Sequence, residues 1–233
     1  MKKLLFVLTG LIVIVVINAQ SLDQIVKNHS AAIKQDKLSK ISSIKITGKM
    51  SAMGMEMPMV LIMKNPDKIK VTYSFSGQEM ISVFDGEKGY MVNPMMGSTN
   101  PIELTGEQLK QVQNNNIFQN QIVNYFKNSQ LTLEGQEDVN NKPAFKLKVN
   151  NESSPIYLYL DKGSYLLVRT TTTINQAGTS MNADTYMSDY VDINDVIMPK
   201  KTIAMMNGME AAVISFDKIE VNIPIDNSIF KLK

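Results

Sequence analysis

Methionine sulfur is the most distinctive chemistry in this sequence. Residues 50–63 read MSAMGMEMPMVLIM, and after Gly54 the apolar side chains fall on every second position. Successive side chains of a β-strand point to opposite faces, so these apolar residues share one face. They are Met55, Met57, Met59, Leu61 and Met63. The pattern predicts a strand with one face of flexible, polarizable thioethers, which adapt to irregular partners.

Two uses of this methionine face remain open. Thioether sulfur is a suitable ligand for Cu(I), so alternate methionines could bind copper. A metal needs ligands that converge on one point, however, and residues i and i+2 lie about 6.5 Å apart along a strand. No cysteine or nearby histidine is present to assist. We therefore expect an apolar lining, with no metal and no cofactor.

Other residues with catalytic or metal-binding chemistry are few. The chain has no cysteine and one histidine, His29, which lies in a helical apolar pattern where packing is the simplest interpretation. A nucleophilic triad and a His/Cys zinc site both lack their residue types, so we predict that the protein is not an enzyme. One loop contains oxygen ligands that could hold calcium: Asp189, Asp192, Asn194 and Asp195. Their spacing is not that of an EF-hand loop, and a solvated acidic turn is the simpler interpretation.

The N-terminus has the composition of a secretory signal. Lys2 and Lys3 precede an apolar run over residues 4–17, and Asn18-Ala19 is a plausible cleavage end. The run is short for a spanning helix, which needs about 20 residues. We expect residues 1–19 to be a cleaved signal peptide, with an uncleaved anchor as the alternative. Residues 20–233 are then expected to form a single domain in the periplasm.

Charge excludes nucleic acid as a partner. The formal net charge is +2, and it comes from Lys2 and Lys3, so the mature chain is near neutral. Nucleic-acid binding proteins carry basic patches with stacking aromatic residues. This chain has one arginine, Arg169, and no tryptophan.

Helices and strands are expected in a definite order. Ser21 and Gln24 form a capping box that begins an amphipathic helix, which ends near residues 35–38. A second capping box, from Thr105 to Gln108, begins a helical segment over about 106–127, broken near residues 114–116. Residues 94–101 are expected to be a loop. Strands are expected at about 41–52, 55–64, 67–76, 79–85, 88–93, 130–138, 142–150, 155–160, 164–175, 179–190, 197–206 and 209–221.

The fold class that follows is mainly β with helices. The apolar positions change from even to odd at Met53-Gly54, which predicts a hairpin turn or bulge there. Short turns join nearly all the expected strands, so the sheet is antiparallel. A sheet of about twelve strands must curl. The two helical segments then fill or cover its concave face.

Three segments in this order resemble the LolA/LolB family, the periplasmic carrier and outer-membrane receptor of bacterial lipoproteins. They are Lys64-Asn65-Pro66, then Phe84-Asp85-Gly86-Glu87-Lys88-Gly89-Tyr90 leading to Asn93-Pro94, and the tail Pro224-Ile225-Asp226-Asn227-Ser228-Ile229-Phe230. The resemblance implies an unclosed, curled antiparallel β-barrel of about 11–12 strands. It also implies a helical lid over a hydrophobic cavity that takes acyl chains.

The family strand that lines the cavity corresponds here to Ile69, Val71, Tyr73 and Phe75. We add the methionine face described above and four further residues, Phe84, Phe118, Ile122 and Phe126. The family's carrier has an arginine that holds the lid, and Asn65 stands at that position. Asn65 is therefore the expected lid contact, although it lacks the charged fork of arginine.

The resemblance implies a periplasmic carrier for acylated lipoproteins or another lipid, held in the cavity and moved towards the outer membrane. Inner- and outer-membrane proteins would be its partners. We expect the protein itself to be a monomer. The alternative is an envelope sensor or protein-interaction domain, because the periplasmic regulator of the envelope-stress sigma pathway has a similar fold. Co-purifying lipid would favour the carrier, whereas a stable protein partner without lipid would favour the sensor.

Overall fold

The computed structural model of this protein describes residues 20–232, apart from residues 115, 152–153 and 177–178. Residues 1–19, where we predicted a signal peptide, lie outside the described residues. No helix in the described part of the chain combines the length and the apolar character needed to cross a bilayer.

One antiparallel sheet contains all thirteen described strands, in the spatial order β6-β5-β4-β3-β2-β1-β13-β12-β11-β10-β9-β8-β7. In chain order the strands are β1 (Ser43–Ala52), β2 (Met55–Lys64), β3 (Lys68–Phe75), β4 (Gln78–Phe84), β5 (Gly89–Asn93), β6 (Ser98–Leu104), β7 (Leu131–Val139), β8 (Lys142–Val149), β9 (Ile156–Asp161), β10 (Leu167–Gln176), β11 (Thr179–Ile193), β12 (Val196–Met206) and β13 (Met209–Val221).

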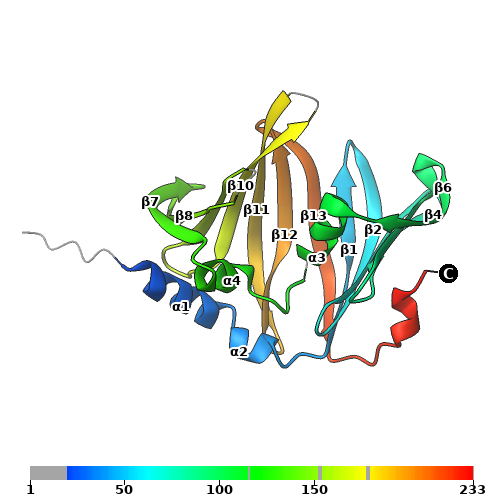
Figure 1. Cartoon of the computed structure of the whole chain (residues 1–233), viewed down its shortest axis with the longest axis horizontal. Coiled ribbons are helices and arrows are strands. Elements are labelled where there is room, and N and C mark those ends of the chain that lie inside the picture. The colour runs from blue at the N-terminus through cyan, green and yellow to red at the C-terminus, as the bar shows by residue number, and fades with distance from the viewer. Residues whose placement is uncertain (1–19, 115, 152–153, 177–178, 233) are drawn as a thin grey trace, which may run out of the picture.

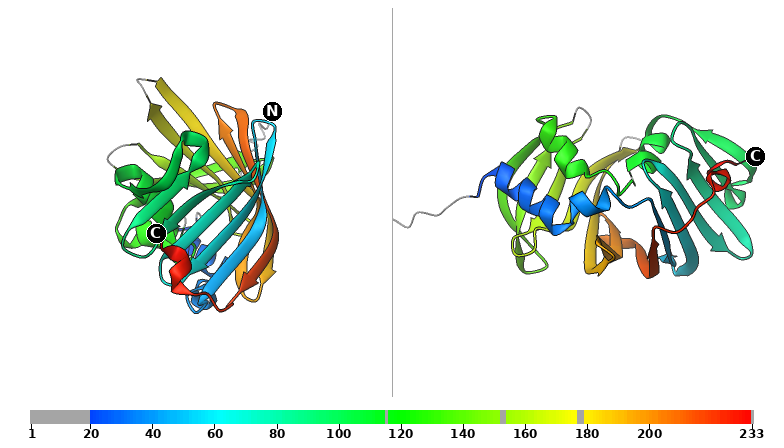
Figure 2. Two further views of the ribbon diagram at one scale, coloured as in Figure 1. Left: turned by 90° about the vertical axis from the view of Figure 1, so that its right-hand side faces the viewer. Right: turned by 90° about the horizontal axis from the view of Figure 1, so that it is seen from below.

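The sheet is curled and unclosed, as predicted (Figures 1 and 2). Sequence neighbours pair throughout each half of the chain, and the halves join where β1 pairs with β13. The two ends of the order, β6 and β7, do not pair with each other, so the barrel stays open. The concave face must therefore be covered by other elements.

The sheet has the predicted form with one strand beyond the twelve expected, because β6 begins inside the loop that we expected over residues 94–101. Pro101 lies within β6, and proline cannot donate a hydrogen bond to the ladder. An edge strand tolerates a proline, because one side of such a strand is unpaired. β6 pairs with β5 alone and is such an edge.

Four α-helices accompany the sheet, and Figure 1 shows α1 and α2 along one end of the strands and α3 and α4 in front of the sheet. Ser21 caps the first helix as expected, since its hydroxyl accepts from Gln24 N. Lys34 has a left-handed conformation and separates the first helix into two. The described helices are α1 (Leu22–Ala32), α2 (Gln35–Leu38), α3 (Gly106–Asn114) and α4 (Gln121–Lys127), with 3₁₀ turns η1 (Pro94–Met96) and η2 (Asn227–Phe230).

The hairpin turn falls at Met53-Gly54, as the change of parity predicted. Both residues have positive φ, 52° and 75°, which suits the tight turns that join antiparallel strands. Met50 lies opposite Met57, and Ala52 lies opposite Met55. The even residues of β1 and the odd residues of β2 therefore share a face.

Two buried clusters divide the concave side of the sheet. The first joins β1–β4 and β11–β13 to residues of α2, α3 and the segment after α3, including Leu38, Leu109 and Phe118. The second joins β7–β10 to α1 and α4, including Ile25 and Ile122. The segment between α3 and α4 crosses from one cluster to the other, and we call this crossing the seam.

The C-terminal tail covers the opposite, convex face beside β2–β4. Lys64 has the opposite parity to the buried Met63, and its Nζ donates to Ile225 O at 2.8 Å. Phe230 of η2 is fully buried, and so is Val83, which faces away from Phe84. The tail therefore stabilises this half of the sheet and leaves the concave face to the helices.

Gly48 provides a test of the join between the two halves. A Cβ at Gly48 would lie 2.1 Å from Ser215 O and 2.9 Å from Phe216 Cα, beside a register shift between β1 and β13. Because both atoms belong to the backbone, we expect Gly48→Ala to lower the free energy of unfolding by about 2–3 kcal/mol or more. Urea denaturation measures the change. Gly163→Ala is the control, since its Cβ would make one ordinary contact, and equal effects of the two variants would contradict the expectation.

Candidate functional site

The strand register defines apolar rows across the concave face. Residues directly opposite in antiparallel strands have neighbouring side chains on one face. The face is the concave one because it contains Ile44 and Ile46, which belong to the helix-contacting first cluster. One row, from β13 to β4, consists of Phe216, Gly48, Met59, Tyr73 and Met80. The next, from β11 to β2, consists of Met187, Thr202, Ile214, Met50 and Met57.

The predicted cavity residues lie on this face but differ in burial. Met63 and Ile69 are fully buried in the first cluster, where they are packed core. Phe84 and Phe118 belong to the same cluster, whereas Ile122 and Phe126 pack in the second. Met57 and Met59 are buried, and the half-buried members are Met55, Leu61, Val71, Tyr73 and Phe75. The half-buried set is the part of the predicted lining that a ligand could still reach.

Tyr73 lies in the middle of the accessible set. Its direct neighbours across the strands are Met59 and Met80. Burial raises the pKa of the Tyr73 phenol above its ordinary value, because the charged form would lose hydration. Its cross-strand neighbours are apolar although the residue is only half-buried.

Two adjacent pockets open at the seam, and they share Gln119, Gln121 and Tyr125 in their walls. The larger has a volume of about 410 Å³ and the smaller about 250 Å³. Only two of the predicted cavity residues line them: Phe84 the larger and Ile122 the smaller. The seam therefore brings a second set of residues into the candidate site.

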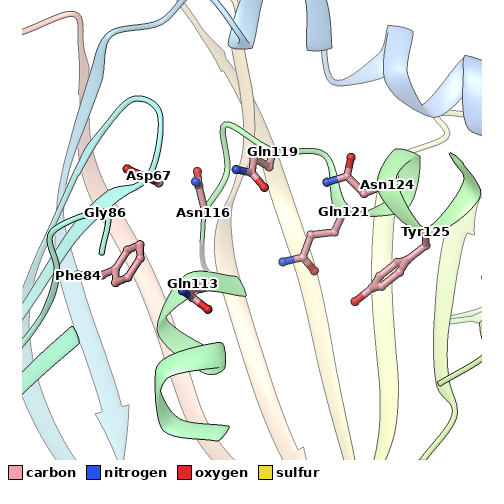
Figure 3. A pocket seen from close by; sticks show the side chains of 9 residues that line it. All are labelled: Asp67, Phe84, Gly86, Gln113, Asn116, Gln119, Gln121, Asn124 and Tyr125. Atoms are coloured by element: carbon pink, nitrogen blue, oxygen red, sulfur yellow. The ribbon is translucent and has the colours of Figure 1, made fainter. Parts of the chain in front are cut away.

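Amide side chains dominate the larger pocket. Figure 3 shows Phe84, Gly86 and Asp67 on one side and residues of α4 on the other. The remaining lining residues are Gln113, Asn116, Gln119, Gln121, Asn124 and Tyr125. Asp67 is the one ionisable carboxylate, and neither pocket has a lysine or arginine among its described lining residues.

The smaller pocket lies between α1, the seam and two strands. Its walls include His29, Ile33, Asn120, Leu158 and Thr170. His29 is 4% exposed, and its Nδ1 lies 2.8 Å from Tyr165 O. A carbonyl only accepts, so Nδ1 carries the proton. Burial lowers the pKa of His29, while the bond to Tyr165 acts in the opposite direction.

Asn65 does not hold the lid in the way we expected. Its Nδ2 donates to Ile41 O at 2.8 Å and to Ser39 O at 3.2 Å, both in the segment after α2. A short amide reaches only its immediate neighbours, unlike an arginine. The lid contact is made instead by Asn116, whose Nδ2 donates to Pro66 O at 2.8 Å. Asn116 Oδ1 also accepts from Phe118 N at 2.9 Å, and the two bonds together hold the seam at the turn between β2 and β3.

The acidic loop considered for calcium is paired with a lysine from the junction of α1 and α2. Lys34 Nζ lies 2.6 Å from Asp192 Oδ2 and 2.9 Å from Asp195 Oδ1. These hydrogen bonds raise the pKa of Lys34 and lower that of Asp195. The ammonium group joins the end of α1 to the β11–β12 turn.

Sequence reasoning missed the polar residues of the seam. The density of Gln and Asn over residues 111–124 was visible, but a pattern of apolar positions does not show where amides gather. His29 was expected only to pack, and the structure also places it in a pocket wall.

Known structures share this arrangement of curled sheet and helices. No protein-family model matches the sequence, and no curated protein matches it. A LolA superfamily protein from Nitrosomonas europaea superposes with a TM-score of 0.55 at 11% identity, over 87% of this chain and 97% of that one. The chain has a LolA-like fold.

Two further structures extend the likeness. A protein from Vibrio parahaemolyticus described as an outer membrane lipoprotein-sorting protein domain gives a TM-score of 0.57 at 10% identity, over 88% of this chain and 97% of that one. A DUF1329 family protein from Desulfovibrio piger superposes with a TM-score of 0.52 at 10% identity, over 89% of this chain and 97% of that one. At these identities the comparison establishes the LolA-like fold, as the sequence motifs predicted.

His29 should make stability depend on pH near neutrality. The unfolded chain takes up a proton near the ordinary histidine pKa of about 6.5, whereas burial keeps the folded pKa lower. Stability is therefore lost as pH falls through this range, by at most about 1.4 kcal/mol per pH unit for one proton. Urea unfolding between about pH 7.5 and 5 measures the slope.

His29→Gln is the matched variant for this measurement, because glutamine can still donate to Tyr165 O but does not titrate. The lowered pKa values of Asp85, Asp161 and Asp226 act below the ordinary value of 3.8, outside this range. A slope that is equally steep in His29→Gln would show that another group is responsible.

Asn116 should hold the seam in place. Asn116→Asp keeps the oxygen that accepts from Phe118 N. It replaces the Nδ2 donor with a second carboxylate oxygen, which would repel Pro66 O. We expect a loss of about 1–3 kcal/mol in unfolding free energy and faster proteolysis between α3 and α4. Asn124→Asp is the control, an exposed amide of the same pocket, and its effect should stay within about 0.5 kcal/mol. Equal protease sensitivity of the two variants would contradict this role.

Proposed function

We propose that this protein is an envelope binding and carrier protein for acylated ligands. The observation that supports it is the set of apolar rows that cross the concave face. Each row spans five strands, and the helices beside it cover the sheet in two separate groups. The LolA-like fold and the name of the Vibrio protein point in the same direction. The proposed ligands are the acyl chains of lipoproteins or of another lipid.

The energetics favour binding of a long chain that can still be released. Burying a methylene contributes about 0.8 kcal/mol, so a chain of about 15 gives on the order of 12 kcal/mol before ordering costs. Methionine side chains change rotamer easily and can repack when the chain leaves. The buried Met57 and Met59, between half-buried neighbours, would provide such a lining.

The periplasmic location and the movement towards the outer membrane belong to the proposal. They depend on the signal peptide predicted for residues 1–19. Sequencing the N-terminus of the protein from its natural cell should find a chain that begins at or near Gln20. An intact Met1 in the membrane fraction would contradict secretion by cleavage.

Tyr73 is the sharpest test of acyl binding. Tyr73→Glu places a carboxylate in the middle of an apolar row, where an unpaired charge is costly. We expect displacement assays with an uncharged fluorescent acyl probe to show at least about tenfold weaker binding, with a smaller effect on the thermal melt. Ile69 is unsuitable for this test because it is fully buried core.

Thr72→Glu is the matched control, since Thr72 is also half-buried but points to the convex face. It should leave probe binding within about twofold, as surface changes usually have small effects. Equal loss in both variants would place the ligand elsewhere. If the protein from its natural compartment carries a stable protein partner and no lipid in native mass spectrometry, the interaction-domain alternative replaces the carrier.

A further inference from the structure

The smaller pocket at the seam combines aliphatic walls with a few polar atoms. Sites of this composition are where small ligands bind, the polar atoms fixing orientation. At about 250 Å³ it is smaller than the roughly 300–1,000 Å³ usual for a whole ligand. It therefore suits one part of a larger molecule. Its aliphatic residues are Ile33, Ile117, Ile122, Leu158 and Leu167.

His29 gives this pocket a hydrogen-bond acceptor. Nδ1 carries the proton and donates to Tyr165 O, so Nε2 of the neutral ring has a free lone pair. His29 lies in the pocket wall, so a ligand donor that enters the pocket could pair with Nε2.

Asn120 gives the same pocket a donor of fixed orientation. It is the N-cap of α4, and its Oδ1 accepts from Val123 N at 3.2 Å. This bond fixes the orientation of the amide, so that Oδ1 faces Val123 N and Nδ2 does not. Nδ2 is buried and has no partner among the described residues. Thr170, opposite Leu158 in the ladder, adds a hydroxyl to the wall.

The charge of the pocket walls narrows the ligand class. Neither the smaller pocket nor the larger one beside it has a lysine or arginine among its described lining residues, and the larger contains Asp67. A carboxylate or phosphate in this place would lose hydration without gaining a cation, which is costly. An uncharged group that both donates and accepts matches the atoms present.

We propose that the smaller pocket binds the uncharged head of an acyl ligand, with a hydroxyl or amide N–H donating to His29 Nε2 and an oxygen accepting from Asn120 Nδ2. Acylglycerols and N-acyl amides have this chemistry, and ionised fatty acids do not. The larger pocket shares three wall residues and continues the site with amides. The inference rests on the proposed function, since it specifies which acyl ligands the protein accepts.

The test compares two ligands with the same chain. Monooleoylglycerol and oleate compete with an uncharged fluorescent acyl probe on delipidated protein at about pH 8, where the carboxyl group is ionised. Monooleoylglycerol should displace the probe at a concentration at least about tenfold lower. Oleate that competes equally well or better would overturn the inference.

Two variants locate the effect in the pocket. Asn120→Ser keeps a good N-cap and removes the amide Nδ2 donor, leaving a shorter hydroxyl that the cap uses as an acceptor, and Thr170→Val removes the hydroxyl with little change of shape. Asn120→Ser should weaken the binding of monooleoylglycerol about five- to tenfold, as expected for one lost hydrogen bond, and Thr170→Val should weaken it somewhat less. Neither variant should change the affinity for oleate by more than about twofold. Thr173→Val is the control on the same strand, because Thr173 points to the convex face beside Asn182.

The outcomes separate this inference from the proposed function. If the probe does not bind at all, the carrier function itself fails. If the probe binds but both variants leave monooleoylglycerol unchanged, the protein is an acyl carrier and the head of its ligand lies outside this pocket. Thermal melts accompany each variant, and Thr170→Val remains a test if Asn120→Ser alters α4.

Discussion

The open edge of the sheet is the constraint on which the rest of the structure depends. β6 and β7 end the strand order without pairing, so the concave face cannot be sealed by closing the barrel. Much of the apolar surface on that face must be covered by side chains from elsewhere, because exposed contiguous apolar surface is unfavourable in water. The chain does this with two helical groups, one for each half of the sheet. Because the covering helices form two groups, a segment must cross between them, and the two pockets lie along this seam.

Polar contacts hold the seam while apolar contacts hold the two halves. Asn116 is buried and bonds both Pro66 O and Phe118 N, which holds the crossing segment at the turn between β2 and β3. The rest of the segment is rich in amides, whose net contribution to stability is small because water can replace their partners. A ligand would open the structure most easily at this place, since opening the buried clusters would expose aliphatic surface.

Much of the fold could be predicted because the alternation of apolar positions and the turn residues determine the strands and their faces. The even-to-odd change at Met53-Gly54 gave the hairpin, and the alternation over Ile69 to Phe75 gave the correct inner face. β6 could not be predicted, because the proline that excludes a central strand is permitted at an edge, and edges are a property of the whole sheet. The site was less predictable still. Burial separates Ile69, which is core, from Tyr73, which is accessible, although both share one strand and one face. The contact of His29 with Tyr165 O and the place of Asn120 in the same pocket wall come from tertiary packing that no local pattern shows.

Affinity and selectivity have different origins in a site of this kind. The apolar rows interact with any long chain, because the hydrophobic effect depends on area and not on direction. They would therefore hold many lipids with similar strength. An unpaired buried donor or acceptor behaves differently, since leaving it unmatched costs about 1–3 kcal/mol and matching it removes that cost. The amide of Asn120 is such a group, and the ring of His29 adds an acceptor to the same small pocket. In such a protein the acyl chain of the ligand would provide the affinity, and the head group would determine the selectivity.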